Sequence, residues 1–188
     1  IEIDGINIKD IALKQLRNKI GFVPQRGILF TGSIKENIRY GNSKVTDQNI
    51  VKALAVAQAD DFIKKLKNGI NYKISQGGTN VSGGQKQRLS IARAIAKNPD
   101  IYVFDDSFSA LDFETDTKLR KELSKITKNK TVLIVAQRIS TIMNADKIIV
   151  LHEGQIVGIG KHHELLKKCE TYKEIALSQL SKEELNNA

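Results

Sequence analysis

Three short polar motifs follow one another along the chain, and their residue types suit the binding of a nucleotide. Ser82-Gly83-Gly84-Gln85 comes first, an apolar run over 101–104 then ends in Asp105, and Ser109-Ala110-Leu111-Asp112 follows. Two glycines that open a helix let the backbone approach an anion, and the helix start offers unpaired N–H groups and a positive dipole end. We expect this first motif to hold a terminal phosphate, although the same residues taken alone also form an ordinary helix N-cap.

A carboxylate at the end of a buried strand is the second chemical signal. Asp105 follows four apolar residues, a position at which an aspartate can hold Mg²⁺ through water next to bound phosphates. No G-x-x-x-x-G-K-[ST] phosphate loop occurs in the sequence; the nearest match, from Gly154 to Lys161, has one spacer residue too many and continues with His162. The motifs therefore indicate the second half of a nucleotide-binding domain without the first.

Hydrophobic patterning predicts the elements that must position these residues. The runs 101–104 and 131–136 are continuously apolar, which predicts strands buried on both faces. The amphipathic segment 112–126 between them predicts a helix, and such a strand–helix–strand unit implies parallel pairing with a right-handed crossover. A further buried strand is expected over 19–24. We therefore predict an α/β fold.

The segment from residue 33 to residue 96 has a helical pattern. Ser33 and Glu36 form a capping-box signature. Further helices are expected from residue 46 or 47, with Ile50, Val51, Leu54 and Ala55 on one face, and over 60–66 and 85–96. Later segments predict a hairpin over 147–159, a helical tail over 162–180 and a frayed end over 181–188. We interpret the three histidines as surface residues and the four tyrosines as packing residues.

In this order the motifs resemble the nucleotide-binding domain of ATP-binding cassette (ABC) transporters, and the likeness extends over nearly all 188 residues. The resemblance implies a RecA-like parallel sheet flanked by helices, with an inserted α-helical subdomain and with the N-terminal part of the core missing. It assigns residues 1–32 to the core as far as the Q-loop, residues 33–96 to the α-helical subdomain with the signature motif, and residues 97–188 to the remaining core and the C-terminal helices.

The resemblance also assigns roles to single residues, with ATP and Mg²⁺ as the cofactors. Gln25, after Gly21-Phe22-Val23-Pro24, is similar to the Q-loop glutamine, which contacts Mg²⁺ and senses the γ-phosphate, so Gln25 and Asp105 are the implied metal ligands. Residues 109–112 resemble the D-loop, which crosses the dimer interface. The implied nucleotide contacts are Gln25, Ser82, Gly83, Gly84, Gln85 and Asp112.

Two residues depart from the family pattern at the implied catalytic positions. The catalytic glutamate that normally follows the Walker-B aspartate is replaced by Asp106, and the switch histidine by Gln137. An aspartate is one methylene shorter and would hold an attacking water poorly, whereas glutamine carries no titratable proton. Together these changes resemble the degenerate half of a heterodimeric exporter. The resemblance then implies a weak ATPase whose intact signature motif serves a second nucleotide-binding domain on a different chain.

The region 29–38 resembles the exporter branch, in which the Q-loop region receives the coupling helices of a transmembrane domain; this implies a place on the cytoplasmic face of the cell membrane. A net charge of +9 could indicate nucleic-acid binding, but the lysines are scattered rather than in blocks, so we expect no nucleic-acid partner. Two other functions stay open: a cassette ATPase of the DNA-repair or chromosome type, and a regulatory module without catalysis. The sequence begins within a motif and is expected to be a piece of a longer polypeptide.

Overall fold

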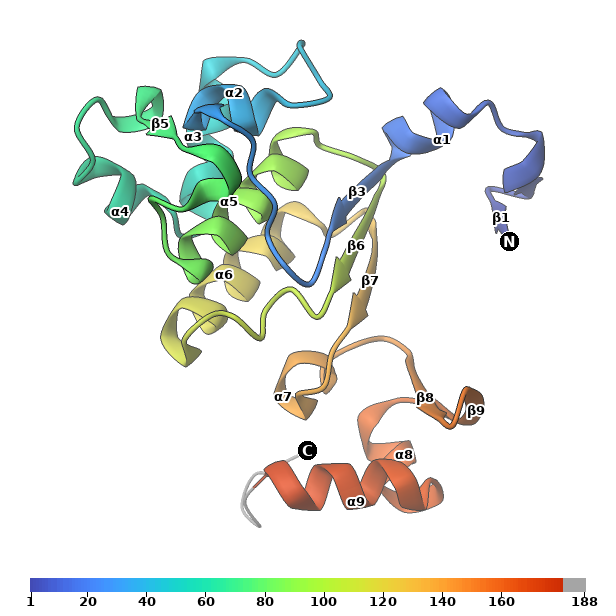
Figure 1. Ribbon diagram of the computed structural model, residues 1–188. Coiled ribbons are helices and arrows are strands. Elements are labelled where there is room, and N and C mark those ends of the chain that lie inside the picture. Colours follow the sequence, from blue (N-terminus) through green and yellow to red (C-terminus); the bar gives the residue numbers. More distant parts are fainter. Residues whose placement is uncertain (181–188) are drawn as a thin grey trace. The chain divides into compact units, whose positions relative to one another are not determined.

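The computed structural model describes residues 1–180, which fall into two compact units, Ile1–Val135 and a second unit that starts at Ala136. Each unit is described by itself, and the expectation for 181–188 lies outside the described residues. The first unit is built on a three-stranded parallel sheet in the order β3-β6-β7 (Figure 1). The predicted α/β class with a parallel sheet and flanking helices is confirmed.

The elements of the first unit match the expected order of strands and helices. In chain order they are β1 (Glu2–Ile3), β2 (Ile6–Asn7), a 3-10 turn (Ile8–Asp10), α1 (Leu13–Lys19), β3 (Ile20–Val23), β4 (Gly32–Ser33), α2 (Ile34–Arg39), α3 (Asp47–Val56), α4 (Asp60–Lys64), a 3-10 turn (Gly69–Asn71), β5 (Lys73–Ile74), a 3-10 turn (Gln76–Gly78), α5 (Gly83–Ala96), β6 (Ile101–Asp105), α6 (Phe113–Ile126) and β7 (Thr131–Val135).

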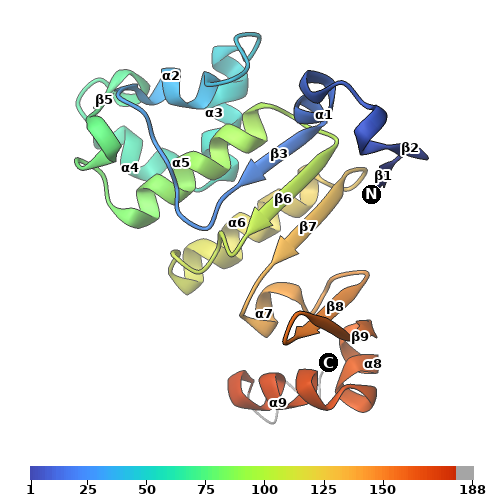
Figure 2. The same ribbon diagram turned by 45° about the vertical axis from the view of Figure 1, so that its right-hand side comes forward.

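One face of the sheet carries the main core. Val23, Phe104 and Ile134 lie in register across β3, β6 and β7, and Val23 and Phe104 are fully buried against the helices. Helices α5 and α6 lie on this face in both ribbon views (Figure 2), and their buried leucines and isoleucines belong to the same core cluster as Phe104. Leu89, Ile91 and Ile95 of α5 face inward as predicted.

The opposite face of the sheet corrects the expectation of strands buried on both sides. Phe22 and Leu133 share a register position through Val103, and their side chains are 56% and 53% exposed. Val135 on the same face of β7 is 51% exposed. The physical reason is that α5 and α6 both cover the other face, so the described residues leave this apolar face open to solvent.

Three of the helices between residues 33 and 96, namely α2, α3 and α5, begin at capping residues that the sequence indicates. Ser33 caps α2, and its hydroxyl accepts a hydrogen bond from the Glu36 N–H while the Glu36 carboxylate accepts one from the Ser33 N–H. One detail of α3 was wrong: Ile50 and Leu54 are buried, but Val51 and Ala55 are exposed. Ala53 completes the buried face instead, because residues three and four apart share a face of a helix.

The second unit packs a hairpin against two helices around its own small core. Its elements are α7 (Ile139–Ile142), β8 (Ile148–His152), β9 (Gln155–Gly160), α8 (His162–Lys168) and α9 (Glu170–Gln179). The helical tail is therefore broken at Cys169, which is buried in an extended conformation. No helix within residues 1–180 is both long and apolar enough to cross a bilayer.

The prediction of a surface position for His162 was wrong. Its side chain is buried, and its Nδ1 lies 2.7 Å from the hydroxyl of Tyr172, ten residues later, on α9. Burial is the main cause that lowers the pKa of His162 below its ordinary value, and the neighbouring His163 lowers it further. Burial also raises the pKa of Tyr172 to about 12, so the phenol stays neutral beside the imidazole.

We expect the stability of the second unit to fall on acidification because of His162. With a lowered folded-state pKa, the unfolded chain binds more protons below about pH 6.5, so stability is retained above that pH and lost as pH falls toward the folded-state pKa. Urea unfolding of this unit across that range measures the slope. His162→Gln removes most of it, while His163→Gln at the exposed neighbour retains it; equal slopes in both variants would contradict the assignment.

Candidate nucleotide site

The signature-like motif forms the first turn of α5. The Ser82 hydroxyl accepts a hydrogen bond from the Gln85 N–H at 3.2 Å, and the Gln85 side-chain oxygen accepts one from the Ser82 N–H at 2.9 Å. This is a capping box, so the N-cap function of the motif is real. The two glycines leave the helix start uncovered: a Cβ built on Gly83 would meet nothing within 4 Å. An anion could therefore approach the N–H groups of this first turn.

The D-loop-like residues lie next to that helix start. A Cβ on Gly84 would come within 3.4 Å of the Ala110 carbonyl oxygen, so the structure brings the first and third motifs together. Asp112 caps α6, where its carboxylate accepts hydrogen bonds from the Thr115 N–H at 2.9 Å and the Thr115 hydroxyl at 2.7 Å. These two bonds lower the pKa of Asp112 and keep it ionised. Its contact with a nucleotide stays a prediction.

Gln25 and Asp106 meet at the carboxyl ends of two neighbouring strands. Gln25 follows β3, Asp106 follows β6, and the Gln25 side-chain nitrogen donates to the Asp106 Oδ2 at 3.2 Å. Asp106 has a positive φ of 42°, a conformation that non-glycine residues adopt at a cost of about 1–3 kcal/mol and that clusters at functional sites. The Asp106 N–H, which donates to the Val135 carbonyl at 2.8 Å, fixes this backbone.

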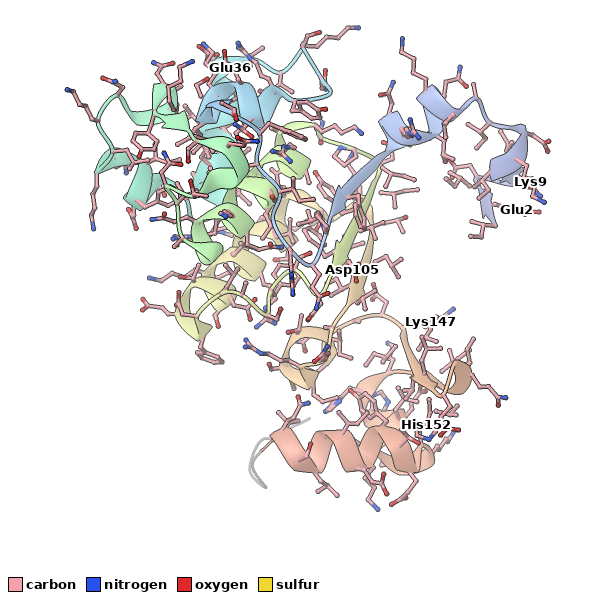
Figure 3. The ribbon with its side chains drawn as sticks, viewed as in Figure 1. Glu2, Lys9, Glu36, Asp105, Lys147 and His152 are labelled. Carbon is pink, nitrogen blue, oxygen red and sulfur yellow. The ribbon has the colours of Figure 1, made fainter. Side chains whose placement is uncertain are left out.

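Asp105 ends β6 at the same edge of the sheet, where Figure 3 labels it. Among the described residues no three His, Cys, Asp or Glu side chains gather into a group that could hold a metal. Mg²⁺ seldom uses a full cage of protein ligands and takes one or two protein oxygens with water and phosphate. The donors at this edge are oxygen ligands of that kind, since the Gln25 amide keeps its oxygen when its nitrogen donates to Asp106. Asp105 and Gln25 therefore fit the ion.

Gln137 belongs to the second unit. Its side chain is exposed, and its carbonyl accepts a hydrogen bond from the Gln179 side chain at 2.8 Å. The Gln179 oxygen in turn accepts from the Ile139 N–H at 2.9 Å. A residue near the end of α9 thus holds the backbone on both sides of Arg138. Sequence reasoning missed Gln179, since no local pattern signals a contact about forty residues away.

Ser107 is a second residue that sequence reasoning missed. It is fully buried, and its hydroxyl donates to the Val23 carbonyl at 2.9 Å, with the Asp105 carbonyl at 3.2 Å. This hydroxyl joins the loop after β6 to the end of β3, and so brings Asp106 and Gln25 to one place. The sequence signal for Ser107 was a hydroxyl residue two positions after a strand, and this pattern is too common to indicate a functional residue.

Comparisons with known proteins show the family of the chain. The family model of ABC transporters matches residues 1–109. An uncharacterized ABC transporter ATP-binding protein of Mycobacterium tuberculosis is 47% identical over 180 residues, which is 94% of this chain and 31% of that protein. A Staphylococcus aureus protein provisionally named a multidrug export ATP-binding/permease protein is 46% identical over 175 residues, 93% of this chain and 30% of that protein.

A solved structure gives the same result for the fold. A bacterial Atm1-family ABC exporter with ATP bound superposes with a TM-score of 0.91 at 35% identity, covering 96% of this chain and 32% of that one. The chain belongs to the ABC transporter family. It spans about a third of the length of the relatives that it matches.

The double use of Ser82 as a cap and as a candidate phosphate ligand can be separated by two substitutions. We expect Ser82→Ala to lower the free energy of unfolding by about 1 kcal/mol, because the cap is lost. Ser82→Asp stays within about 0.5 kcal/mol of wild type, since aspartate is also a good N-cap and suits the positive helix end.

Urea unfolding measures both variants. Thr46→Ala removes the matched cap of α3, outside the candidate site, and is expected to cost about as much as Ser82→Ala. If Ser82→Asp destabilises the chain as much as Ser82→Ala, the hydroxyl does more in α5 than cap it.

Proposed function

We propose that this chain is the ATP-binding cassette of a membrane ABC exporter, which binds ATP and Mg²⁺ at a dimer interface on the cytoplasmic face of the membrane. The observation that carries the proposal is the contact between Gln25 and Asp106 at the edge of the sheet where β6 ends in Asp105. The contact joins the Gln25 amide to the Asp106 carboxylate next to Asp105, and the family match supports the proposal.

Each residue at this edge has a chemical task in the proposal. Asp105 and the Gln25 amide oxygen would hold Mg²⁺, directly or through water, and when bound the ion would supply charge neutralisation at the β- and γ-phosphates. Asp106 is the residue that would orient the attacking water. Gln25, hydrogen-bonded to Asp106 in the structure, links the metal side of the site to the water side.

We propose that this chain's own site hydrolyses ATP slowly. Asp106 is one methylene shorter than the glutamate of the family pattern, and a displacement of about 1 Å at a reacting group can cost on the order of 100-fold in rate. The hydrogen bond from the Gln25 amide also occupies one of the two carboxylate oxygens of Asp106. Gln137 can hydrogen-bond a phosphate but cannot take or give a proton near neutral pH.

The signature motif then serves the site of a second nucleotide-binding domain, on a different chain. Ser82 to Gln85 retain the family pattern in full, and the first turn of α5 is open at Gly83. A chain with a weakened catalytic edge and an intact signature motif is suited to complete the partner's competent site. The proposed complex is thus asymmetric, with turnover supported in trans by this chain.

We expect Ser82→Asp to lower ATP turnover of the full-length protein, assembled with its partner in nanodiscs, by on the order of 100-fold. The added carboxylate keeps α5 capped but repels the terminal phosphate at the partner's site. Asp106→Glu combined with Gln137→His is expected to raise turnover up to about twofold, since a second working site is added. Steady-state phosphate release measures both changes.

Thr46→Ala is the control, because it removes a helix cap of the same subdomain without touching the motif. Unchanged turnover in Ser82→Asp would contradict the role in trans. A complex with no ATP turnover in any variant would instead favour a regulatory nucleotide-binding module.

The surface that would receive the transmembrane domain has a hollow of about 330 Å³. It lies between the end of α1, the start of β3, the end of α2 and the last turns of α5. Tyr40 stands at its rim and stacks on Phe30 with ring centroids 4.2 Å apart. The lining residues are Arg17, Ile20, Gly21, Phe22, Ile38, Tyr40, Asn42, Val45, Arg93, Ala94 and Lys97.

This hollow is positively charged. Three of its lining residues are basic and none is acidic, and burial lowers the pKa of both Arg93 and Lys97 with no carboxylate to offset it. Both side chains donate to backbone carbonyls, Arg93 to Ile28 and Asn37, and Lys97 to Arg17 and Ile20. We propose that a coupling helix with an apolar side chain and a carboxylate docks here. We propose no nucleic-acid partner.

We expect Tyr40→Ala to weaken this docking, because Tyr40 lines the hollow and is 59% exposed. The lost stacking on Phe30 costs about 1 kcal/mol of stability, which the fold should tolerate. The measurement is the stimulation of ATP turnover by transport substrate in the full-length complex, expected to fall severalfold. Val51→Ala, at an exposed apolar residue of α3, is the control and leaves the stimulation unchanged; equal effects of both variants would contradict this docking surface.

A further inference from the structure

Helix α5 carries a row of polar side chains on its buried side. Gln87 and Ser90 are 1% and 3% exposed, and Arg93 follows one turn later on the same face. A buried polar group is costly unless it is hydrogen-bonded, so each of these residues should have a partner. Two of them do. Gln87 donates to the Pro24 carbonyl and Arg93 to the Ile28 carbonyl, both in the segment 24–28 that follows β3 and contains Gln25, and Arg93 also donates to the carbonyl and side-chain oxygens of Asn37.

The first contact fixes the peptide bond just before Gln25. The Gln87 side-chain nitrogen donates to the Pro24 carbonyl at 3.0 Å, across 63 residues of sequence. That carbonyl and the N–H of Gln25 belong to one planar peptide unit. Holding the carbonyl therefore orients the backbone from which the Gln25 side chain leaves. The preceding carbonyl, that of Val23, is held from the other side by the Ser107 hydroxyl.

The second and third contacts keep the rest of this segment on α5. A Cβ on Gly27 would lie 2.7 Å from the Lys86 carbonyl carbon and oxygen and 2.9 Å from the Gln87 nitrogen, so the two backbones touch and only glycine fits. The Arg93 Nη1 donates to the Ile28 carbonyl at 3.0 Å. The segment is thus anchored on α5 before and after Gln25, by contacts that need no nucleotide.

We propose that Gln87 is a positioning residue, which holds Gln25 in a fixed relation to the signature motif at the start of α5. The motif begins at Ser82, five residues before Gln87 on the same rigid helix. A displacement of α5 therefore carries Gln25 with it, so the signature motif serving one site and the glutamine serving the other move together. The inference rests on the proposed function, in which Gln25 acts at this chain's own nucleotide site.

The test uses the full-length protein with its partner. It measures the concentration of the Mg²⁺ complex of 8-azido-ATP that gives half-maximal photolabelling of this chain. Gln87→Met keeps an unbranched side chain but loses the donor, and we expect that concentration to rise about tenfold. Gln87→Leu also lacks the donor and carries no charge, so it gives the same shift if Gln87→Met folds poorly. Ser90→Ala is the matched control, because Ser90 is buried on the same face and its hydroxyl has no partner among the described residues. We expect its half-maximal concentration to stay within twofold of the wild-type value.

A double-mutant cycle with Gln25→Ala separates positioning from a general structural effect. If Gln87 acts through Gln25, Gln87→Met adds less than about twofold in the Gln25→Ala background. A full further tenfold shift there would overturn the proposal, because Gln87 would then act independently of Gln25.

Hydrogen exchange separates failure of this inference from failure of the proposed function. If Gln25→Ala leaves labelling unchanged, the assignment of Gln25 to the nucleotide site is wrong. The exchange rates of the amides of residues 25–28 then still test whether Gln87 anchors this segment. Exchange at least tenfold faster in Gln87→Met than in wild type and Ser90→Ala supports the anchor. Exchange at the wild-type rate in Gln87→Met overturns it.

Discussion

Helix α5 lies so close to strand β3 that glycine is needed near both ends of the contact. A Cβ on Gly21 would come within 2.7 Å of the Pro99 ring and 3.4 Å of the Ala94 carbonyl, and Gly27 touches the backbone of Lys86 and Gln87. Lys97 closes the far end by donating to the Ile20 carbonyl. Because α5 starts with the signature-like motif, this one packing contact fixes the helix start, the strand end and Gln25 relative to one another.

The sheet is supported unevenly, and this agrees with a nucleotide-binding domain whose phosphate loop is not in the sequence. The face toward α5 and α6 buries Tyr102 and Phe104, whereas Phe22 and Leu133 on the other face are about half exposed. Among the described strands β7 pairs only with β6, so its second edge is open. Open apolar strand edges of this kind favour aggregation.

Local signals predicted the elements, and distant contacts decided the site. Ser82 and Gln85 indicated the start of α5, and the apolar runs predicted β6 and β7, because caps and periodicity act within a few residues. The pairing of Gln87 with Pro24 spans 63 residues and has no local signal apart from a polar side chain on the buried side of the helix. His162 was misplaced for the same reason, since its partner Tyr172 lies on another helix. The bare face of the sheet could not be foreseen, because an apolar strand does not show which neighbours cover it.

The loop after β6 carries the clearest mark of function in this architecture. Asp106 takes a positive φ that aspartate adopts at a cost, and four hydrogen bonds hold it there. Its N–H donates to Val135, its carbonyl accepts from the hydroxyl and the N–H of Ser109, and its carboxylate accepts from Gln25. A strained backbone persists only where the surrounding structure determines it. In the proposed function this loop is the catalytic edge, and the Asp106 side chain is one methylene shorter than the glutamate of the family pattern. A scaffold preserved around a shortened residue is what the proposed asymmetric pair requires, since the same strand end and the same α5 must still present the signature motif to the partner's site.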